Sequence, residues 1–252
     1  MSKSSLALRE SKNINSFGVG VKIGGLQKLT LIDYPGKIAT TVFLMGCNFR
    51  CAFCYNSAIV LPEKIKKQKP TPQKEFFNFL KERKTLLDAV CIGGGEPTIY
   101  KDLPNFIKKI KKMGFFVKLD TNGTNPTMLN YLIDKKLIDY AAMDIKAPKE
   151  KYELVCQRKV NIKNIEKSIK ILKEGRIDYE FRTTIVPTLH EKEDILKILR
   201  WIRPSKKYYL QNFSPKTTIN LKLESVKPYS QEFLLEIQKL LEPFFETCQV
   251  RQ

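Results

Sequence analysis

Met45-Gly46-Cys47-Asn48-Phe49-Arg50-Cys51-Ala52-Phe53-Cys54-Tyr55-Asn56 is a loop sequence that continues from an apolar, β-branched run at residues 38–45. Its three cysteines have the spacing C-x3-C-x2-C. Three thiolates on one short loop can hold three irons of a cubic 4Fe–4S cluster, so that the fourth iron has no protein thiolate. A metal position without a protein ligand is open to a substrate. The segment therefore predicts an iron–sulfur site with one open corner.

Other uses of three close cysteines fit this sequence less well. A structural zinc site needs four protein ligands, but the chain's only histidine is His190 and no second C-x-x-C pair is present. A disulfide needs an oxidising compartment, and nothing in the sequence indicates one. A loop that contains Gly46, Asn48 and Arg50 is also a poor setting for buried structural cysteines. We therefore interpret the three cysteines as cluster ligands.

An aromatic residue, Phe53, stands immediately before the third cysteine. Together with the cysteine spacing, it resembles the hallmark of the radical S-adenosylmethionine (SAM) superfamily. The resemblance implies that Cys47, Cys51 and Cys54 ligate the cluster. It also implies that SAM chelates the open iron through its amino and carboxylate groups, with Phe53 and Tyr55 beside it.

Strands and helices alternate along the rest of the chain. Residues 17–45 predict a β-hairpin with arms at 21–31 and 38–45. Further strands are predicted at 89–92, 115–119, 140–143, 179–186, 208–213 and 244–250, and helices at 73–86, 103–113, 127–136, 162–174, 191–202 and 230–241. This alternation predicts an α/β fold with a parallel sheet. Six or so units fit a partial (β/α)6 TIM-like barrel with an N-terminal β-hairpin, which is also the fold that the radical SAM resemblance implies.

The length and composition suit one large domain. The chain has 252 residues, of which 42% are hydrophobic. We expect residues 1–16 to form a flexible N-terminal tail and residues 17–252 to form a single radical SAM domain. The Pro- and Lys-rich residues 62–72 are expected to be a linker. The sequence shows no secretory segment and no membrane span, so we expect a cytoplasmic protein with reduced cysteines and no membrane partner.

Most of the distinctive polar residues follow predicted strands. Glu96, Asp120, Asp144 and Arg182 all stand near a strand end, as does the cysteine loop. Ligands of parallel α/β folds bind at the carboxyl ends of the strands. Isolated acidic residues there are usually caps or solvated loop residues, but this many in register predict one shared mouth.

The segment Gly93-Gly94-Gly95-Glu96-Pro97 predicts a close approach to a ligand. Glycines let the backbone come near a bound molecule, and Glu96 can accept hydrogen bonds from an ammonium group. The segment lacks the Gly-Lys-Ser/Thr ending of a nucleotide P-loop. It is similar to the G-G-E-P segment of radical SAM proteins, which implies that Gly94, Gly95 and Glu96 contact the amino group of SAM.

Two further segments narrow the resemblance. Asp120-Thr121-Asn122-Gly123 and Met143-Asp144-Ile145-Lys146 resemble segments of glycyl-radical-enzyme activating enzymes, the group that contains pyruvate formate-lyase activase. Without the resemblance they would be a turn and an exposed charge pair. The resemblance implies that Thr121, Asp144 and Lys146 lie at SAM. It also implies that Asp120 and Asp144, with Thr121 and Met143, hold a monovalent cation beside the SAM carboxylate.

Residues 24–37 and 181–187 are similar to the stand-alone activating proteins of anaerobic ribonucleoside-triphosphate reductase. That subgroup implies SAM contacts for Arg182 and His190, although a helix-start or surface role for His190 is also open. It implies a glycyl radical enzyme as partner, here an anaerobic ribonucleotide reductase. Because no cysteine-rich insert is present, electrons must come from an external donor such as flavodoxin or ferredoxin.

The chain is strongly basic, with a formal net charge of +19. Such a surface attracts phosphates, nucleic acid or an acidic protein, but the lysines recur on predicted helix faces, as at 64–69 and 108–112. We interpret them mainly as solvated residues. A radical SAM enzyme that modifies RNA or a small purine-like substrate stays open as an alternative, as does a protein that binds a cluster without turning SAM over.

Cys91, Cys156 and Cys248 are isolated in sequence and predict buried thiols.

Overall fold

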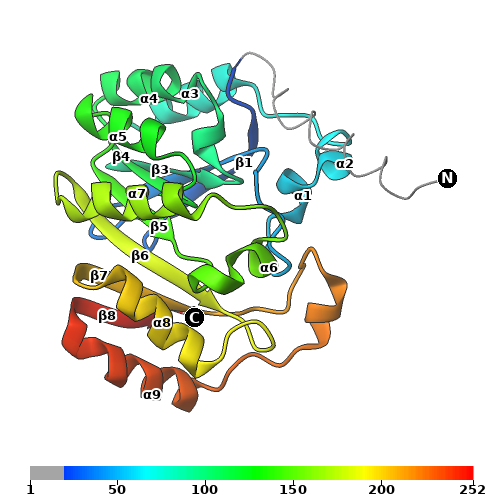
Figure 1. The fold of residues 1–252 in the computed structure, drawn as a ribbon. Helices are drawn as coiled ribbons and strands as arrows, with labels where there is room; N and C mark the ends of the chain where they lie inside the picture. Colours follow the sequence, from blue (N-terminus) through cyan, green and yellow to red (C-terminus); the bar gives the residue numbers. More distant parts are fainter. Residues whose placement is uncertain (1–19, 252) are drawn as a thin grey trace.

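The computed structural model describes residues 20–251, so the expected tail at residues 1–16 and the first three residues of the expected hairpin lie outside the described residues. Within this range the strands form one eight-stranded sheet in the order β1 to β8 (Figure 1). The strands are β1 (Ile23–Thr30), β2 (Ala39–Leu44), β3 (Ala89–Gly94), β4 (Phe116–Thr121), β5 (Tyr140–Asp144), β6 (Asp178–Ile185), β7 (Ser205–Asn212) and β8 (Phe245–Arg251).

The sheet begins with the predicted hairpin. Strands β1 and β2 pair antiparallel, with Ile23 opposite Leu44. Each later neighbour pairs parallel, beginning with Thr40 of β2 beside Val90 of β3. In the order of the described strands, β1 and β8 are the two ends of the sheet rather than neighbours. The predicted α/β class and partial barrel with an N-terminal hairpin are therefore confirmed.

The helices connect the parallel strands, and in Figure 1 α8 and α9 lie beside β7 and β8 at one end of the molecule. They are α1 (Ser57–Val60), α2 (Pro62–Ile65), α3 (Gln73–Glu82), α4 (Leu103–Lys112), α5 (Pro126–Asp134), α6 (Tyr152–Cys156), α7 (Ile162–Lys173), α8 (Lys192–Ile202) and α9 (Gln231–Leu241). Short 3₁₀ helices lie at Pro97–Ile99, Lys149–Lys151, Leu221–Ser225 and Glu242–Phe244. Within residues 20–251, no helix is both long and apolar enough to cross a membrane.

The expected linker at residues 62–72 is wrong in its first part. Helix α2 begins there with Pro62 in its first turn, where a proline's fixed φ suits a helix and its missing N–H costs nothing. The backbone N–H of Thr71 then donates to the oxygen of Ile23, so the end of the segment attaches to the edge strand β1. Proline and lysine content suggested a loose connection, whereas the structure ties the segment to the hairpin.

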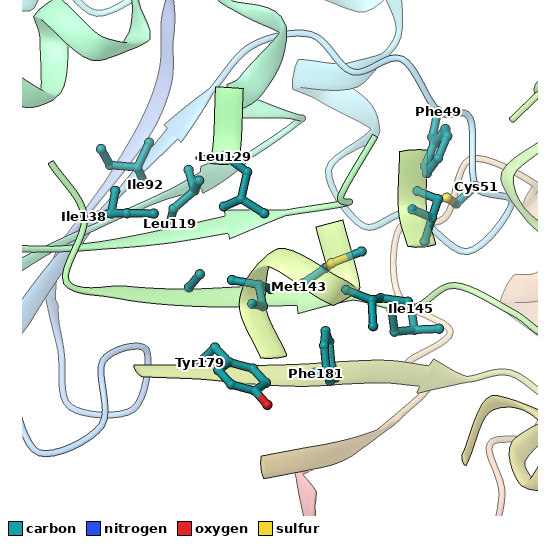
Figure 2. Close-up of a cluster of buried hydrophobic side chains, with 14 of the residues drawn as sticks. Phe49, Cys51, Ile92, Leu119, Leu129, Ile138, Met143, Ile145, Tyr179 and Phe181 are labelled. Carbon is teal, nitrogen blue, oxygen red and sulfur yellow. The ribbon is translucent and has the colours of Figure 1, made fainter. Parts of the chain in front are cut away.

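A large apolar cluster lies between the sheet and its helices. Leu119, Met143 and Phe181 come from the neighbouring strands β4, β5 and β6 and are completely buried. Figure 2 shows the same cluster extending to Phe49 and Cys51 in the cysteine loop. The cysteine loop therefore packs against the main hydrophobic core.

Strand alternation sends polar residues to the opposite face of the sheet. In β4, Val117, Leu119 and Thr121 alternate with Lys118 and Asp120, so these two charged side chains share one face. The same alternation sets Phe181 apart from its neighbour Arg182 in β6. The inner face of the partial barrel is therefore rich in charged side chains, and these form the wall of the site.

Candidate functional site

A cavity of about 470 Å³ opens at the carboxyl ends of the strands. Its wall combines the cysteine loop with strand-end residues from several positions along the chain. The predicted site residues that line it are Cys47, Cys51, Phe53, Cys54, Tyr55, Gly94, Gly95, Glu96, Asp120, Thr121, Asp144, Lys146 and Arg182. Its volume lies in the range of small-molecule sites, roughly 300–1,000 Å³. The structure thus brings the strand-end motifs into one space.

The cysteine loop is held by backbone contacts on two sides. Arg50 donates from its guanidinium to the carbonyls of Cys47 and Phe49, at 2.7 Å and 2.6 Å. On the other side, the backbone N–H of Glu96 donates to the oxygen of Gly46 at 2.8 Å. A Cβ on Gly95 would lie 1.8 Å from that same oxygen. A glycine is therefore required where the G-G-E-P turn passes the cysteine loop.

The three thiols differ in their surroundings. Burial raises the pKa of the Cys47 and Cys54 thiols, whereas a hydrogen bond from the Cys156 thiol lowers the pKa of Cys51. Two N–H groups also point at the sulfur of Cys47, from the backbone of Phe49 at 3.3 Å and from the side chain of Asn122 at 4.0 Å. Donors of this kind stabilise charge on a ligating sulfur.

Among residues 20–251, no three His, Cys, Asp or Glu side chains are arranged to hold a single metal ion. A cubic cluster does not need such a set, because each cysteine binds a different iron. The cysteine loop remains suited to a cluster, since all three cysteines face one cavity.

Glu96 joins two turns of the site to each other. One carboxylate oxygen, Oε1, accepts from the backbone and hydroxyl of Thr98 and from the hydroxyl of Thr121, and the other accepts from the backbone N–H of Asn122. The side chain is only 1% exposed. Burial raises its pKa, although these donors oppose the shift. Glu96 lines the cavity, but its carboxylate is already engaged, with two hydrogen bonds from Thr98 and two from the Asp120–Gly123 turn.

A network of ion pairs joins neighbouring strands on the inner wall of the cavity. Arg182 donates to Asp144 at 2.9 Å and to Asp120 at 3.0 Å, so one guanidinium links two strands. Lys146 forms an ion pair with the other oxygen of Asp144 at 3.0 Å, and Lys118 forms one with the other oxygen of Asp120 at 2.5 Å. Burial alone would raise the pKa of Asp144, but Arg182 and Lys146 outweigh it and lower the pKa to about 2. The carboxylates are therefore ionised at neutral pH.

His190 lies behind the cavity rather than in its described wall. The side chain is completely buried. Its Nδ1 accepts from the backbone N–H of Val186 at 3.1 Å, and its Nε2 lies 2.8 Å from the carbonyl of Lys146. Because Nδ1 accepts, the proton of the neutral ring is on Nε2, which donates to Lys146. His190 thus fixes the backbone of Lys146 and packs against the Phe53 ring, with 6.4 Å between the ring centroids.

This arrangement predicts an acid sensitivity that depends on the chain's single histidine. Burial lowers the pKa of His190 below its ordinary 6.5, with Asp194 opposing and Lys151 adding to the shift. Below pH 6.5, His190 is therefore protonated in the unfolded chain but stays neutral in the folded chain. The free energy of unfolding then falls as the pH falls. Urea titration should show the free energy of unfolding decreasing by up to about 1.4 kcal/mol between pH 7.5 and 5.5.

His190→Gln is the matched variant for this prediction, because an amide can accept and donate at similar positions but does not titrate. Its unfolding free energy should lack the histidine contribution, so that the difference between the two proteins changes with pH. Parallel pH curves for the wild type and His190→Gln would contradict the prediction.

A segment after β7 covers the cysteine loop. The backbone N–H of Asn220 donates to the oxygen of Ala52 at 2.9 Å. The hydroxyl of Tyr55 accepts from the backbone N–H of Ser214 at 2.8 Å, and its ring stacks on Phe213. Asn212 also lines the cavity, and its Oδ1 is buried without a partner in the described part of the chain. A buried acceptor in a cavity wall requires a donor from a ligand or water.

Sequence reasoning missed several of these residues. Asn122 was treated as part of a turn, although it reaches both Asn48 and the sulfur of Cys47. Lys118 stands two positions before Asp120 in a strand, and this spacing alone could have placed both on one face. Asn212 and the segment that follows it carried no recognisable signal.

Comparison with known proteins agrees with this geometry. A sequence profile of the radical SAM superfamily matches residues 41–202, and the chain therefore belongs to that superfamily. A Methanocaldococcus jannaschii protein that carries the provisional name glycyl-radical enzyme activating enzyme is 35% identical, over 91% of this chain and 95% of its own. The pyruvate formate-lyase-activating enzyme of Clostridium pasteurianum is 26% identical, over 89% of this chain and 98% of its own. Within the superfamily, the chain belongs with the glycyl-radical enzyme activating enzymes.

The solved structures give the same fold. Streptococcus suis SuiB bound to SAM superposes with a TM-score of 0.62 at 18% sequence identity, over 81% of this chain. The matched part is 48% of the SuiB chain, so this chain spans about half of that protein.

The residues present fit the cofactors of a radical SAM enzyme, a 4Fe–4S cluster and SAM. Cys47, Cys51 and Cys54 would supply the thiolates, and the unpartnered Oδ1 of Asn212 could accept from a hydroxyl or amino group of a nucleoside. When bound and reduced, such a cluster supplies the electron for reductive cleavage of SAM. The protein contributes the charged wall and the buried cavity in which SAM is oriented.

Proposed function

We propose that this chain cleaves SAM reductively and uses the 5′-deoxyadenosyl radical to take a hydrogen atom from the α-carbon of a glycine on a partner enzyme. The products are then 5′-deoxyadenosine, methionine and a glycyl radical on the partner. The observation that carries the proposal is the near full-length similarity to the Methanocaldococcus jannaschii relative named for this activity. The partner that we propose is an anaerobic ribonucleoside-triphosphate reductase, supported by the resemblance of residues 24–37 and 181–187.

Each wall residue has a role in this proposal. Lys146 and Arg182 present positive charge to the SAM carboxylate, while the ionised Asp144 presents negative charge to its ammonium group. Gly94 and Gly95 let the backbone approach SAM, and Phe53 and Tyr55 pack beside it. These last contacts are hydrophobic and exclude water from the reaction.

Two residues act through others. Glu96 holds the Asp120–Gly123 turn against the cysteine loop, and His190 holds the backbone carbonyl of Lys146. We therefore assign both a positioning role rather than direct contact with SAM.

The electron for SAM cleavage comes from an external donor in this proposal. Apart from the cysteine loop, the sequence offers only Cys91, Cys156 and Cys248, which are buried in β3, α6 and β8. They form no second cluster motif. A flavodoxin or ferredoxin in the cytoplasm is the donor class that we propose.

The test is anaerobic incubation of the cluster-loaded chain with SAM, a strong reductant and a purified anaerobic ribonucleotide reductase. Electron paramagnetic resonance should show a glycyl doublet together with 5′-deoxyadenosine. A reductase whose radical-site glycine is replaced by alanine is the control and should give no doublet. Other glycyl radical enzymes tested in parallel decide whether the partner, rather than the chemistry, is assigned wrongly.

The net charge of +19 favours one alternative, a radical SAM enzyme that acts on RNA or a small purine-like substrate. SAM cleavage without a doublet on any candidate partner, together with a salt-sensitive RNA complex, would support that alternative. Absence of SAM cleavage under all conditions would instead indicate a non-catalytic role.

A further inference from the structure

We propose that Lys118 supplies the positive charge that a monovalent cation would otherwise provide beside Asp120 and Asp144, so that this chain binds SAM without added Na⁺ or K⁺. The inference rests on the proposed placement of SAM in the cavity, and it replaces the cation site that the sequence resemblance implies. It does not depend on which partner receives the radical.

The carboxylate oxygens of Asp120 and Asp144 are already occupied. At Asp120, Oδ1 accepts from the Nζ of Lys118 at 2.5 Å and Oδ2 from Nη1 of Arg182 at 3.0 Å. At Asp144, Oδ1 accepts from Nε of Arg182 at 2.9 Å and Oδ2 from Nζ of Lys146 at 3.0 Å. All four carboxylate oxygens of the implied cation site are therefore bound by nitrogens of the chain itself.

The charges of this network do not cancel. Two carboxylates face three protein cations, which leaves one positive charge within the network. Glu96 and Asp33 also line the cavity, but the ion pairs described for these three cations do not include them. Glu180 lies 4.0 Å from Arg182, but it is already paired with Arg251 at 2.8 Å, and this second pair is neutral. An added monovalent cation would meet repulsion, whereas the carboxylate of SAM would meet attraction.

Lys118 is buried in the wall of the partial barrel. Its side chain is only 1% exposed, and a buried ammonium is tolerated only with a charged partner. Lys118 lies on the same face of β4 as Asp120 and stands between Cys91 and Tyr140 of the neighbouring strands. Its ammonium is therefore fixed at Asp120 by the strand and does not exchange with salt in solution.

A salt series on the anaerobically reconstituted chain tests the proposal. Binding of radiolabelled SAM is measured by equilibrium dialysis in choline chloride, KCl and NaCl at equal ionic strength, with 5′-deoxyadenosine formation followed under a reductant free of Na⁺ and K⁺. For the wild type, the Kd for SAM should differ by less than about twofold among the three salts. A Kd at least roughly tenfold lower in KCl or NaCl than in choline chloride would overturn the proposal.

Lys118→Met gives the converse test. Removing the ammonium frees an oxygen of Asp120, so SAM should bind roughly tenfold more weakly in choline chloride and regain affinity as KCl or NaCl is added. Equal weakness in all three salts would overturn the proposal. Lys111→Met is the control, because Lys111 pairs with Asp139 on a partly exposed surface and should leave the SAM affinity unchanged. If Lys118→Met does not fold, the wild-type salt series still decides the question, and the partner assay is not involved.

Discussion

Cys51→Ala is expected to abolish the cluster and, with it, SAM cleavage. Cys51 lies in the cavity wall with Cys47 and Cys54. In the cluster that we propose, each of the three thiolates would hold a separate iron. Losing one leaves too few ligands, so the effect should exceed the 10- to 100-fold loss that is typical when a residue that only orients a ligand is removed. We expect iron content near background and 5′-deoxyadenosine formation at least roughly 1,000-fold below wild type.

The chain contains its own controls for this prediction. Cys91→Ala and Cys248→Ala remove buried thiols from β3 and β8 and should keep the iron content of the wild type. Cys156→Ala is the most informative control, because the Cys156 thiol donates a hydrogen bond to Cys51. It should also keep the cluster. If Cys156→Ala lost its iron while Cys51→Ala retained it, the ligand set proposed for the site would be wrong.

Arg182→Met is expected to cost the largest part of the SAM affinity among the charged wall residues. Arg182 is 12% exposed and is bonded to both Asp120 and Asp144. Removing one partner from a buried ion pair costs about 3–5 kcal/mol when burial is complete, because the remaining charges lose their compensation. That cost falls on the stability of the fold, and it is smaller here because the two carboxylates are about one-quarter exposed. For binding, losing the proposed charge-assisted contact of Arg182 to the SAM carboxylate should raise the Kd for SAM roughly 100-fold in equilibrium dialysis.

Two variants separate charge from geometry at this position. Arg182→Lys keeps the charge, but one ammonium cannot span two carboxylates as a guanidinium fork does, so its Kd should lie between those of the wild type and Arg182→Met. Arg176→Met removes an arginine whose partners, Asp134 and Glu174, are on the surface. Its SAM affinity should equal that of the wild type. An unchanged Kd in Arg182→Met would contradict the role given to this side chain.

Much of the fold could be predicted because local sequence patterns indicate where its strands, turns and helices lie. Buried apolar runs at β2 to β7 and the turn before Ala39 identify the strands and hairpin, and the parallel order follows from alternation with helices. The placement of Asp120 and Asp144 at one edge follows from the same topology. These features depend on residues that are near one another in sequence or on the general geometry of parallel sheets.

The features that could not be predicted depend on contacts between distant residues. Asn122 meets the sulfur of Cys47 across 75 positions, and Asn220 meets Ala52 only because a segment after β7 folds back. Lys118 looks like an ordinary solvated lysine in a lysine-rich chain, and only the enclosed inner face of the barrel buries it. Helix α2 was missed because the proline and lysine content of residues 62–72 indicated a linker, although Pro62 is the first residue of a helix.

The segment that covers the cysteine loop has a consequence for biosynthesis. The hydrogen bond between Tyr55 and Ser214 cannot form until Ser214 has been synthesised, and Ser214 stands 159 positions later in the chain. At the usual rate of translation, about 5–20 residues per second, the nascent loop leaves the ribosome roughly 8 to 32 s before its cover exists. During that interval its thiols are accessible both to iron delivery and to oxidants. Cluster loading during synthesis would therefore meet an open loop, whereas in the mature molecule the thiols are reached through the cavity that they line.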